Sequence, residues 1–400
     1  MKNFILLFII HELIFPIYLN EIKISGNKNI HNQIILREIK HPIPGILDTN
    51  IKINDQNRLK NLGIFKNVKI SEIDSTYLIT VVEKNQYSII PLIDYKKKYG
   101  WRYGFDFIHL NFMGKNETII MGLMVGNLLS CNLEYIKPNL INGTSNSSFL
   151  IDNKNINHHV YPVITNFLKI STITKINSNQ KQKIIELGYE NVISKIDSNH
   201  INLQKIDEIN LYGDSYLKTK IQYKNIISPY IKNFKLELIN NWSKYKKKAY
   251  HTFSFNFEYQ YNLKNQIFNP TATFTNISII QFSNELPYYR KLYLGGIEYV
   301  RGYSPFPNQN GIYEKNIEVD NIVYNSFELQ FSIFEKFNLN GILFFDHGLG
   351  WMIDSNPQLS SNILGTGLGF RISLLPGSKI GFDIGINPKG QIHFYFSSMN

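Results

Sequence analysis

The residues that could bind metal or perform catalysis do not occur at productive spacings in this sequence. Asp346 and His347 are adjacent, and so are His158 and His159. Because neighbouring residues on a β-strand point to opposite faces, neither pair can share one ion on a strand. Cys131 is the single cysteine, so no internal disulfide and no cysteine-based metal site can form. The sequence also has no nucleophile–base set, phosphate loop or readable carboxylate pair, so we expect no enzyme, no metal and no cofactor.

The composition favours a membrane β-barrel over a soluble or nucleic-acid-binding protein. Of the 400 residues, 14% are aromatic and 18% are charged, whereas soluble domains carry about 25% charged residues. Outward apolar residues that alternate with inward polar ones give a barrel this intermediate composition. The net charge of +11 could indicate a nucleic-acid partner. The lysines are scattered, however, and we expect their two compact runs, 96–98 and 246–248, at strand ends or in loops, so we expect no nucleic acid.

The amino terminus predicts a secretory signal peptide over residues 1–19. Lys2 precedes an apolar run from Phe4 to Ile10. This run is shorter than the roughly 20 apolar residues that a membrane-spanning helix needs. The alternatives are a buried first strand and an uncleaved anchor.

Residues 20–85 predict a small domain with the element order β-α-α-β-β. The first strand alternates apolar and polar residues and ends in a turn at Gly26. Two helices follow, and Gly63 stands where a glycine commonly ends a helix. Alternation over 64–70 and 77–83 then predicts a hairpin.

Residues 86–400 predict a transmembrane antiparallel β-barrel. The segment 253–263 places aromatic residues at every second position and polar residues between them. Its eleven residues match the 9–11 that a tilted membrane-spanning strand needs. Such strands must close into a barrel, because hydrocarbon offers no partner for free backbone groups. The remaining length predicts about 16 strands at roughly 20 residues each, with the Asn- and Ser-rich segments 141–160 and 172–182 as long loops. A soluble β-sandwich is the alternative.

Residues 20–85 resemble a POTRA domain, the periplasmic module that precedes the barrel in the BamA-type outer-membrane assembly-factor superfamily. The alternative is another small ferredoxin-like or KH-like module. The resemblance rests on three motifs: Ile22-x-Ile24-x-Gly26-Asn27, Arg58-Leu-x-x-Leu-Gly-x-Phe65-x-x-Val68 and Ile79-x-Val81-x-Glu83.

The barrel region resembles the same superfamily through an ordered set of motifs. Each motif alone is weak, but together they span nearly the whole barrel. In chain order they are Gly100-Trp-x-x-Gly104, Tyr135-Ile-Lys-Pro138, Leu294-Gly-Gly-x-x-x-Val-Arg301-Gly302-Tyr303, Phe344-Phe-Asp346-x-Gly348 and Gly365-x-Gly-x-Gly-Phe-Arg371.

The resemblance implies an extracellular loop that folds into the lumen, with Arg301, Gly302 and Tyr303 at its tip. In the superfamily, the arginine of this tip meets an aspartate of the barrel wall. Carried over, this predicts a pair of Arg301 with Asp346, in the wall motif that ends at Gly348, because a guanidinium suits a carboxylate bidentately. Gly302 would allow a tight turn, and Gly295 and Gly296 would let the base of the loop approach the wall. An ordinary lumenal role for Asp346, with mixed partners, is the alternative.

The resemblance implies an outer-membrane protein assembly factor in bacteria, with its small domain in the periplasm. Its partners would be unfolded outer-membrane clients, membrane lipid and accessory assembly lipoproteins. Clients would pair at the seam between segments 87–95 and 391–396. A polypeptide-secreting pore of the same superfamily and a passive porin or structural barrel are the alternatives. The single POTRA-like module, and the four residues that follow Phe396 at the carboxyl terminus, depart from the superfamily's usual pattern.

Overall fold

The chain forms two compact units in the computed structural model. The first consists of residues up to Ser88 together with His109–Thr118, and the second of Ile89–Ile108 and the chain from Ile119 onward. The structure describes residues 17–399 except 97–99, 127–128, 139–144, 158–162, 179–180, 197–213, 226–229, 244–248, 264–269, 284–285, 306–307, 310–311, 314–316, 335–337, 354–360 and 376–377. Residues 1–16, which hold most of the predicted signal peptide, lie outside the described part.

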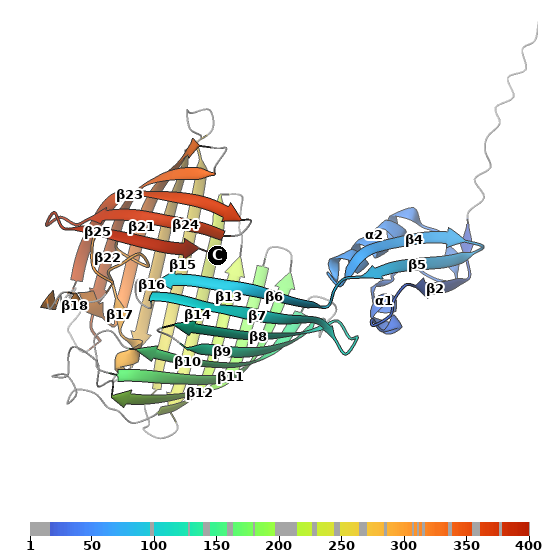
Figure 1. Ribbon diagram of the computed structural model, residues 1–400, viewed down its shortest axis with the longest axis horizontal. Coiled ribbons are helices and arrows are strands. Elements are labelled where there is room, and N and C mark those ends of the chain that lie inside the picture. Colours follow the sequence, from blue (N-terminus) through green and yellow to red (C-terminus); the bar gives the residue numbers. More distant parts are fainter. Residues whose placement is uncertain are drawn as a thin grey trace, which may run out of the picture. The chain divides into compact units, whose positions relative to one another are not determined.

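A three-stranded sheet and two helices make up most of the first unit (Figure 1). The sheet order is β2-β5-β4, with β2 parallel and β4 antiparallel to the central strand. Leu19, which the sequence prediction assigned to the signal peptide, is fully buried in this core. The elements are β1 (Tyr18–Leu19), β2 (Glu21–Ser25), α1 (Asn32–Glu38), β3 (Gly45–Ile46), α2 (Thr49–Asn61), β4 (Phe65–Ile73) and β5 (Thr76–Glu83).

No helix in the described ranges is both long enough and apolar enough to cross a bilayer.

A buried carboxylate ties the second helix of this unit to its surroundings. Asp55 of α2 is fully buried. It accepts hydrogen bonds from the backbone N–H of Lys40 at 2.9 Å and from the hydroxyl of Tyr77 at 3.1 Å, and it pairs with Arg58. A buried charge is tolerated only when its acceptor positions are filled in this way. The network therefore fixes α2 against β5 and against the segment after α1.

A turn between two strands of the long sheet belongs to the first unit. The backbone carbonyl of Gly114 accepts a hydrogen bond from the N–H of His31 at 3.1 Å. The side-chain amide of Asn111 donates to the carbonyl of Asn29 at 3.4 Å. Gly114 has φ +73°, and a Cβ there would lie 2.7 Å from the His31 ring. Close backbone approach thus joins this turn to the start of α1.

The second unit is built on one antiparallel sheet of sixteen strands, which curls as Figure 1 shows. Each strand pairs with its sequence neighbour, and β16 pairs with β21 across the intervening loop. The strands are β6 (Tyr87–Lys96), β7 (Gly100–Phe112), β8 (Glu117–Gly126), β9 (Ser130–Pro138), β10 (Ser145–Asn157), β11 (Val163–Ser178), β12 (Lys181–Ile196), β13 (Asp214–Asn225), β14 (Ile231–Ser243), β15 (Ala249–Asn262), β16 (Thr271–Phe282), β21 (Asn321–Phe334), β22 (Leu339–Trp351), β23 (Ser361–Leu375), β24 (Ser378–Ile386) and β25 (Ile392–Met399).

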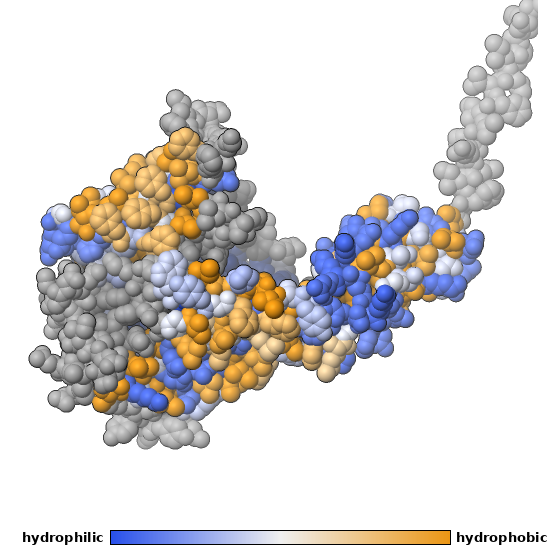
Figure 2. Space-filling view, in the orientation of Figure 1, coloured by the Kyte–Doolittle hydropathy of each residue, from blue (hydrophilic) through white to orange (hydrophobic). Residues whose placement is uncertain are grey.

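The two faces of the sheet differ in polarity, as period-two alternation requires. On β12, Leu187 and Ile193 are exposed on one face, whereas Glu186 and Glu190 are buried on the other. Apolar residues cover the outer surface over much of the sheet in Figure 2. Exposed apolar residues on one face and buried charges on the other are the reverse of a soluble protein and typical of a barrel in lipid. The mostly-β prediction with sixteen antiparallel strands is confirmed.

The prediction of long loops at 141–160 and 172–182 was wrong. Most of these residues lie in β10, β11 and β12. Their Asn and Ser side chains satisfy one another across the strands: the amide of Asn166 donates to Asn153 at 2.6 Å and to Asn155 at 2.7 Å. Polar residues that usually mark loops are therefore accommodated on strands when cross-strand partners are available.

A carboxylate of the first unit should make its stability sensitive to acid. Burial raises the pKa of Glu83, but hydrogen bonds from the backbone N–H groups of Lys28, Asn29 and Ile30, at 2.7, 2.9 and 3.0 Å, outweigh it and lower the pKa from 4.5. The stabilisation of the folded unit by ionised Glu83 is therefore complete above pH 4.5. It is lost as the pH falls through the lowered pKa of Glu83 in the folded state.

When the pH is lowered from 5 to 3, we expect the urea midpoint of the first unit to decrease more in the wild type than in Glu83→Gln. Pulse proteolysis of the full chain measures this midpoint. Equal acid sensitivity of the two proteins would contradict this assignment. Asp74→Asn, on an exposed turn, serves as the control because it removes a carboxylate without that hydrogen-bond set.

Candidate functional site

The loop between β16 and β21 folds against the buried face of the sheet. Its described part includes a short helix η2 (Tyr288–Arg290) and the strand pair β17 (Leu292–Tyr293) and β20 (Glu318–Val319). A second small pair is formed by β18 (Asn308–Gln309) and β19 (Ile312–Tyr313). Apolar side chains fasten the loop to the wall in one cluster: Tyr293, Leu294, Val300, Tyr303, Ile317, Val319, Ile322, Tyr324 and Ile363.

The structure brings Arg301 of this loop onto Asp346 of β22. The guanidinium donates from Nε to Oδ2 at 2.7 Å and from Nη2 to Oδ1 at 2.8 Å, which is the bidentate arrangement. The backbone N–H of Arg301 also donates to Oδ2, at 3.1 Å. Only 3% of Arg301 and none of Asp346 is exposed. The pair is thus desolvated and held by three hydrogen bonds.

Further acidic groups surround the same guanidinium. Nη1 of Arg301 lies 2.7 Å from Glu328 of β21 and 3.3 Å from Asp383 of β24. Asp383, which is fully buried, also pairs with Arg371 of β23. The guanidinium carbon of Arg301 lies 3.5 Å from the ring centroid of Phe344, a cation–π contact. Arg301 therefore links residues of β21, β22 and β24.

The backbone of the loop tip is bound by the last strand. The hydroxyl of Tyr395 on β25 accepts from the N–H of Gly302 at 2.9 Å and donates to the carbonyl of Tyr303 at 2.6 Å. Gly302 has φ +106°, and a Cβ there would lie 2.9 Å from the backbone carbon of Ile386. Glycine is needed both for this turn and for this approach. The tip is thereby tied to a strand at one end of the sheet.

Glycines of three neighbouring strands form the floor beneath the tip. A Cβ on Gly365 of β23 would lie 1.7 Å from the carbonyl oxygen of Arg301, and one on Gly385 of β24 would lie 2.4 Å from the N–H of Gly302. A Cβ on Gly348 of β22 would meet the Val300 side chain at 2.6 Å. The wall is therefore shaped to admit backbone rather than side chains at this point.

Gly295 and Gly296 pack against a different segment from the one that the sequence predicted. A Cβ on Gly295 would lie 2.0 Å from the carbonyl oxygen of Ser304, and Gly296, at φ +95°, packs on Pro305. The N–H of Gly296 donates to the carbonyl of Val300 at 3.1 Å. These glycines let the loop close on its own returning segment rather than on the wall.

Sequence reasoning missed four partners of the tip, which are Glu328, Phe344, Asp383 and Tyr395, and it missed Arg371, which pairs with Asp383. Strand parity carried a signal for some of them. Asp383 alternates with the apolar residues of its strand, and so do Glu328 and Tyr395 on theirs. Which of many inward polar residues lies beside the tip depends on strand register, which the alternation does not specify.

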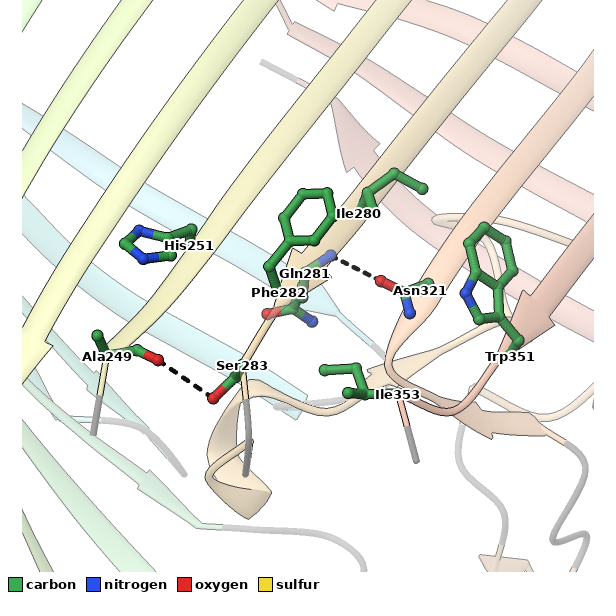
Figure 3. A pocket seen from close by; sticks show the side chains of 9 residues that line it. All are labelled: Ala249, His251, Ile280, Gln281, Phe282, Ser283, Asn321, Trp351 and Ile353. Atoms are coloured by element: carbon green, nitrogen blue, oxygen red, sulfur yellow. Dashed lines mark hydrogen bonds between the residues drawn. The ribbon is translucent and has the colours of Figure 1, made fainter. Parts of the chain in front are cut away.

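A cavity lies at the loop ends of β15, β16, β21 and β22 (Figure 3). Its lining includes His251, Gln281, Phe282, Asn321 and Trp351. The side-chain oxygen of Asn321 accepts from the backbone N–H of Gln281 at 2.6 Å. The Gln281 amide in turn donates to the carbonyls of Arg290 and Asp320, at 3.0 and 2.8 Å. These bonds fix both ends of the loop to the sheet where it leaves and rejoins it.

The two end strands of the sheet, β6 and β25, are not paired with one another in the described ranges. The rings of Trp101 on β7 and Phe396 on β25 nevertheless approach to 6.2 Å between centroids. Apolar side chains are exposed on both end strands, among them Ile89 and Ile93 on β6 and Ile392 and Phe394 on β25. Pro91 lies within β6, and it has no backbone N–H to donate to a further strand.

Comparison with known sequences supports the resemblance seen in the motifs. Residues 272–398 match the Omp85 superfamily domain, a range that includes the loop and β21 to β25. No curated protein matches the chain.

Several solved structures share the fold. BamA from Haemophilus ducreyi lacking POTRA domains 1-3 aligns with a TM-score of 0.78 at 15% identity, over 96% of this chain and 84% of that one. CdiB from Acinetobacter baumannii aligns with a TM-score of 0.58 at 15% identity, over 96% and 74% of the two chains. CdiB from Escherichia coli aligns with a TM-score of 0.58 at 11% identity, over 95% and 76%. The domain match over residues 272–398 supports the predicted superfamily, and these likenesses show that the fold is shared.

Arg301→Ala should release the loop tip. The change leaves Asp346 buried without its cation, whereas Asp383 keeps Arg371, and removing one partner of a buried pair costs about 3–5 kcal/mol. We expect faster proteolysis between β16 and β21 and a lower temperature for loss of the compact band in heat-modifiability gels. Lys235→Ala, which breaks an ion pair with Glu237 away from the tip, is the control. Unchanged proteolysis and thermal stability in Arg301→Ala would refute the anchoring role.

Gly365→Ala tests the glycine floor independently of charge. A methyl group 1.7 Å from the Arg301 carbonyl must displace the tip, and overpacking of this kind costs about 1–3 kcal/mol. We expect loop proteolysis to increase although every charged residue is retained. Gly390→Asn is the control, since Gly390 has nothing within 4 Å of its Cβ position and asparagine tolerates its φ of +76°. A tip that stays protected in Gly365→Ala would rule out the close approach.

Proposed function

We propose that this member of the Omp85 superfamily folds client β-barrels into the bacterial outer membrane. The observation that carries the proposal is that the two end strands of the sheet, β6 and β25, are not paired with one another in the described part of the chain. In hydrocarbon an unpaired backbone group costs several kcal/mol. A client strand that pairs with such an edge satisfies its own backbone groups and those of the edge, and so enters the bilayer from the side.

The last strand is the better template of the two edges. β6 contains Pro91, which interrupts its row of donors, and proline is a common device against edge pairing. β25 contains no proline and presents Ile392 and Phe394 on its exposed apolar face. Tyr395 ties β25 to the buried loop tip, which would hold the edge in place while a client pairs with it.

The first unit, in this proposal, is a POTRA-like domain in the periplasm that passes unfolded clients to the barrel. Its β-α-α-β-β order supports this, apart from the short strands β1 and β3. The alignment with BamA over 96% of the chain also supports it, because the uncovered 4% is much shorter than the unit. Its edge strand β2 would hold an extended client segment by strand addition.

The proposed partners are unfolded outer-membrane clients and the lipid around the barrel, with accessory assembly lipoproteins as further partners. The proposal requires no cofactor, nucleic acid or enzymatic step, because pairing of backbone groups provides the driving force. The alternatives are a polypeptide-secreting pore and a passive porin. The loop that packs inside the sheet weighs against the passive porin, which needs an open lumen, but not against a secretion pore of the same superfamily, in which the same loop is expected.

A reconstituted folding assay tests the proposal. Liposomes containing the full chain should fold a urea-unfolded outer-membrane barrel faster than empty liposomes, as measured by the heat-modifiable shift of the client on gels. The same chain with Phe394→Cys, in a Cys131→Ser background, should form a disulfide with a cysteine in the client's terminal strand during folding.

Phe274→Cys is the matched control, because Phe274 is likewise an exposed aromatic residue but lies on β16, in the middle of the sheet. We expect little adduct there. Folding no faster than in empty liposomes would overturn the proposed function, and equal adducts at both positions would overturn the assignment of β25 as the template.

A further inference from the structure

The loop that carries the arginine tip also contacts a second region of the inner wall, which is formed by other strands of the sheet. Its residues Leu286 to Arg290 lie against β11, β12, β13 and β15, whereas the tip lies against β21 to β25. In the strand order these two groups do not overlap, and β12 is six places from β22. The second contact was not anticipated from any motif in the sequence.

The centre of this second contact is an ion pair. Nη2 of Arg290 donates to Oε2 of Glu190 on β12 at 2.7 Å. The Arg290 side chain is 25% exposed and that of Glu190 is 7% exposed. The guanidinium carbon also lies 5.2 Å from the ring centroid of Tyr250 on β15, within the range of a cation–π contact.

Two tyrosines beside Arg290 extend the contact over further strands. The hydroxyl of Tyr288 is hydrogen-bonded to Thr165 of β11 at 2.8 Å and to Ser194 of β12 at 2.5 Å. The hydroxyl of Tyr289 is hydrogen-bonded to that of Tyr216 on β13 at 2.7 Å. Three consecutive residues of the loop therefore place all three of their polar groups on the wall.

Apolar packing accompanies these polar bonds. Leu286 and Tyr289 pack on a buried cluster of Val192, Tyr216 and Tyr250. The ring of Tyr289 also meets that of Phe167 on β11 edge to face, at 5.5 Å between centroids. A segment held by an ion pair, three hydrogen bonds from two hydroxyl groups and ring packing is a docked element rather than a passing connection.

We infer that the loop is a strap fastened at two anchors, Arg290 on one side of the lumen and Arg301 on the other, and that it closes the lumen to ions while both hold. The anchors lie eleven positions apart in the sequence, and both contacts are made at once, so the segment between them spans the two parts of the wall. The Gln281 amide, which binds the carbonyls of Arg290 and Asp320, fixes the base of the strap.

The strap has a consequence for how a client would move. If both anchors hold, the interior is not a conduit, and a client strand is restricted to the route along the sheet edge. The inference rests on the barrel lying in a bilayer, as proposed above. It does not depend on the identity of a client or on any folding activity.

Single-channel recording in potassium chloride with the full chain in planar bilayers tests the strap. The wild type should reside mostly at a low conductance level. Arg290→Ala should raise the open probability by roughly tenfold or more, since loss of a largely buried ion-pair partner shifts such an equilibrium by at least that factor. Lys220→Ala breaks a comparable ion pair with Glu237 that does not involve the strap, and it should leave the open probability unchanged.

A charge exchange separates loss of the anchor from general damage to the barrel. Arg290→Glu alone should be open, and Arg290→Glu combined with Glu190→Arg should return towards the closed level. A wild type that is steadily open, or an Arg290→Ala trace that matches those of the wild type and Lys220→Ala, would overturn the strap. A closed wild type opened by Arg290→Ala would support it even if the liposome folding assay failed, so the two proposals can fail separately.

Discussion

The guanidinium of Arg301 is buried against the inner wall, and a charge in that position persists only if the surroundings neutralise it. Asp346 does so bidentately, and Glu328 and Asp383 lie against the remaining nitrogen. These acids come from three different strands, so the arrangement exists only when β21, β22 and β24 are in their native register. The loop and the wall therefore specify one another: the carboxylates need the cation, and the cation needs all of the strands in place.

The glycine floor and Tyr395 connect the Arg301 site to the strand at the edge of the sheet. Gly365 and Gly385 allow the tip backbone to touch the wall, and Tyr395 then binds that backbone from the last strand. An edge strand has neighbours on one side only and would otherwise be the least supported element. The tip supplies support to β25 from inside the barrel and does not pair with its backbone edge. This combination suits a strand that must be ordered and still available for pairing.

The same loop bears on the choice among functions. A passive porin needs an open aqueous path. Here the interior contains a loop with an apolar cluster at its tip and a tyrosine–arginine segment on a second part of the wall. An assembly factor that works at its edge has no such requirement. The superfamily domain by itself does not separate assembly from secretion, and neither does the loop, which weighs only against the passive porin.

The sequence by itself determined the class of fold and one pair of the site. Alternation of period two is a local property, so the strand at 253–263 could be predicted without knowing its neighbours. The motifs then linked Arg301 to Asp346. Local pattern failed where polar composition imitated a loop, as at 141–160, because the partners of those asparagines lie on other strands.

Only the tertiary structure decided what the register brings together. Asp383 and Tyr395 are far from Arg301 in the sequence, and nothing local distinguishes them from other inward residues. The contact of Arg290 with Glu190 likewise joins residues one hundred positions apart. Pairing between distant strands is fixed by the summed fit of sixteen strands and a loop, and no single segment of the sequence contains that information.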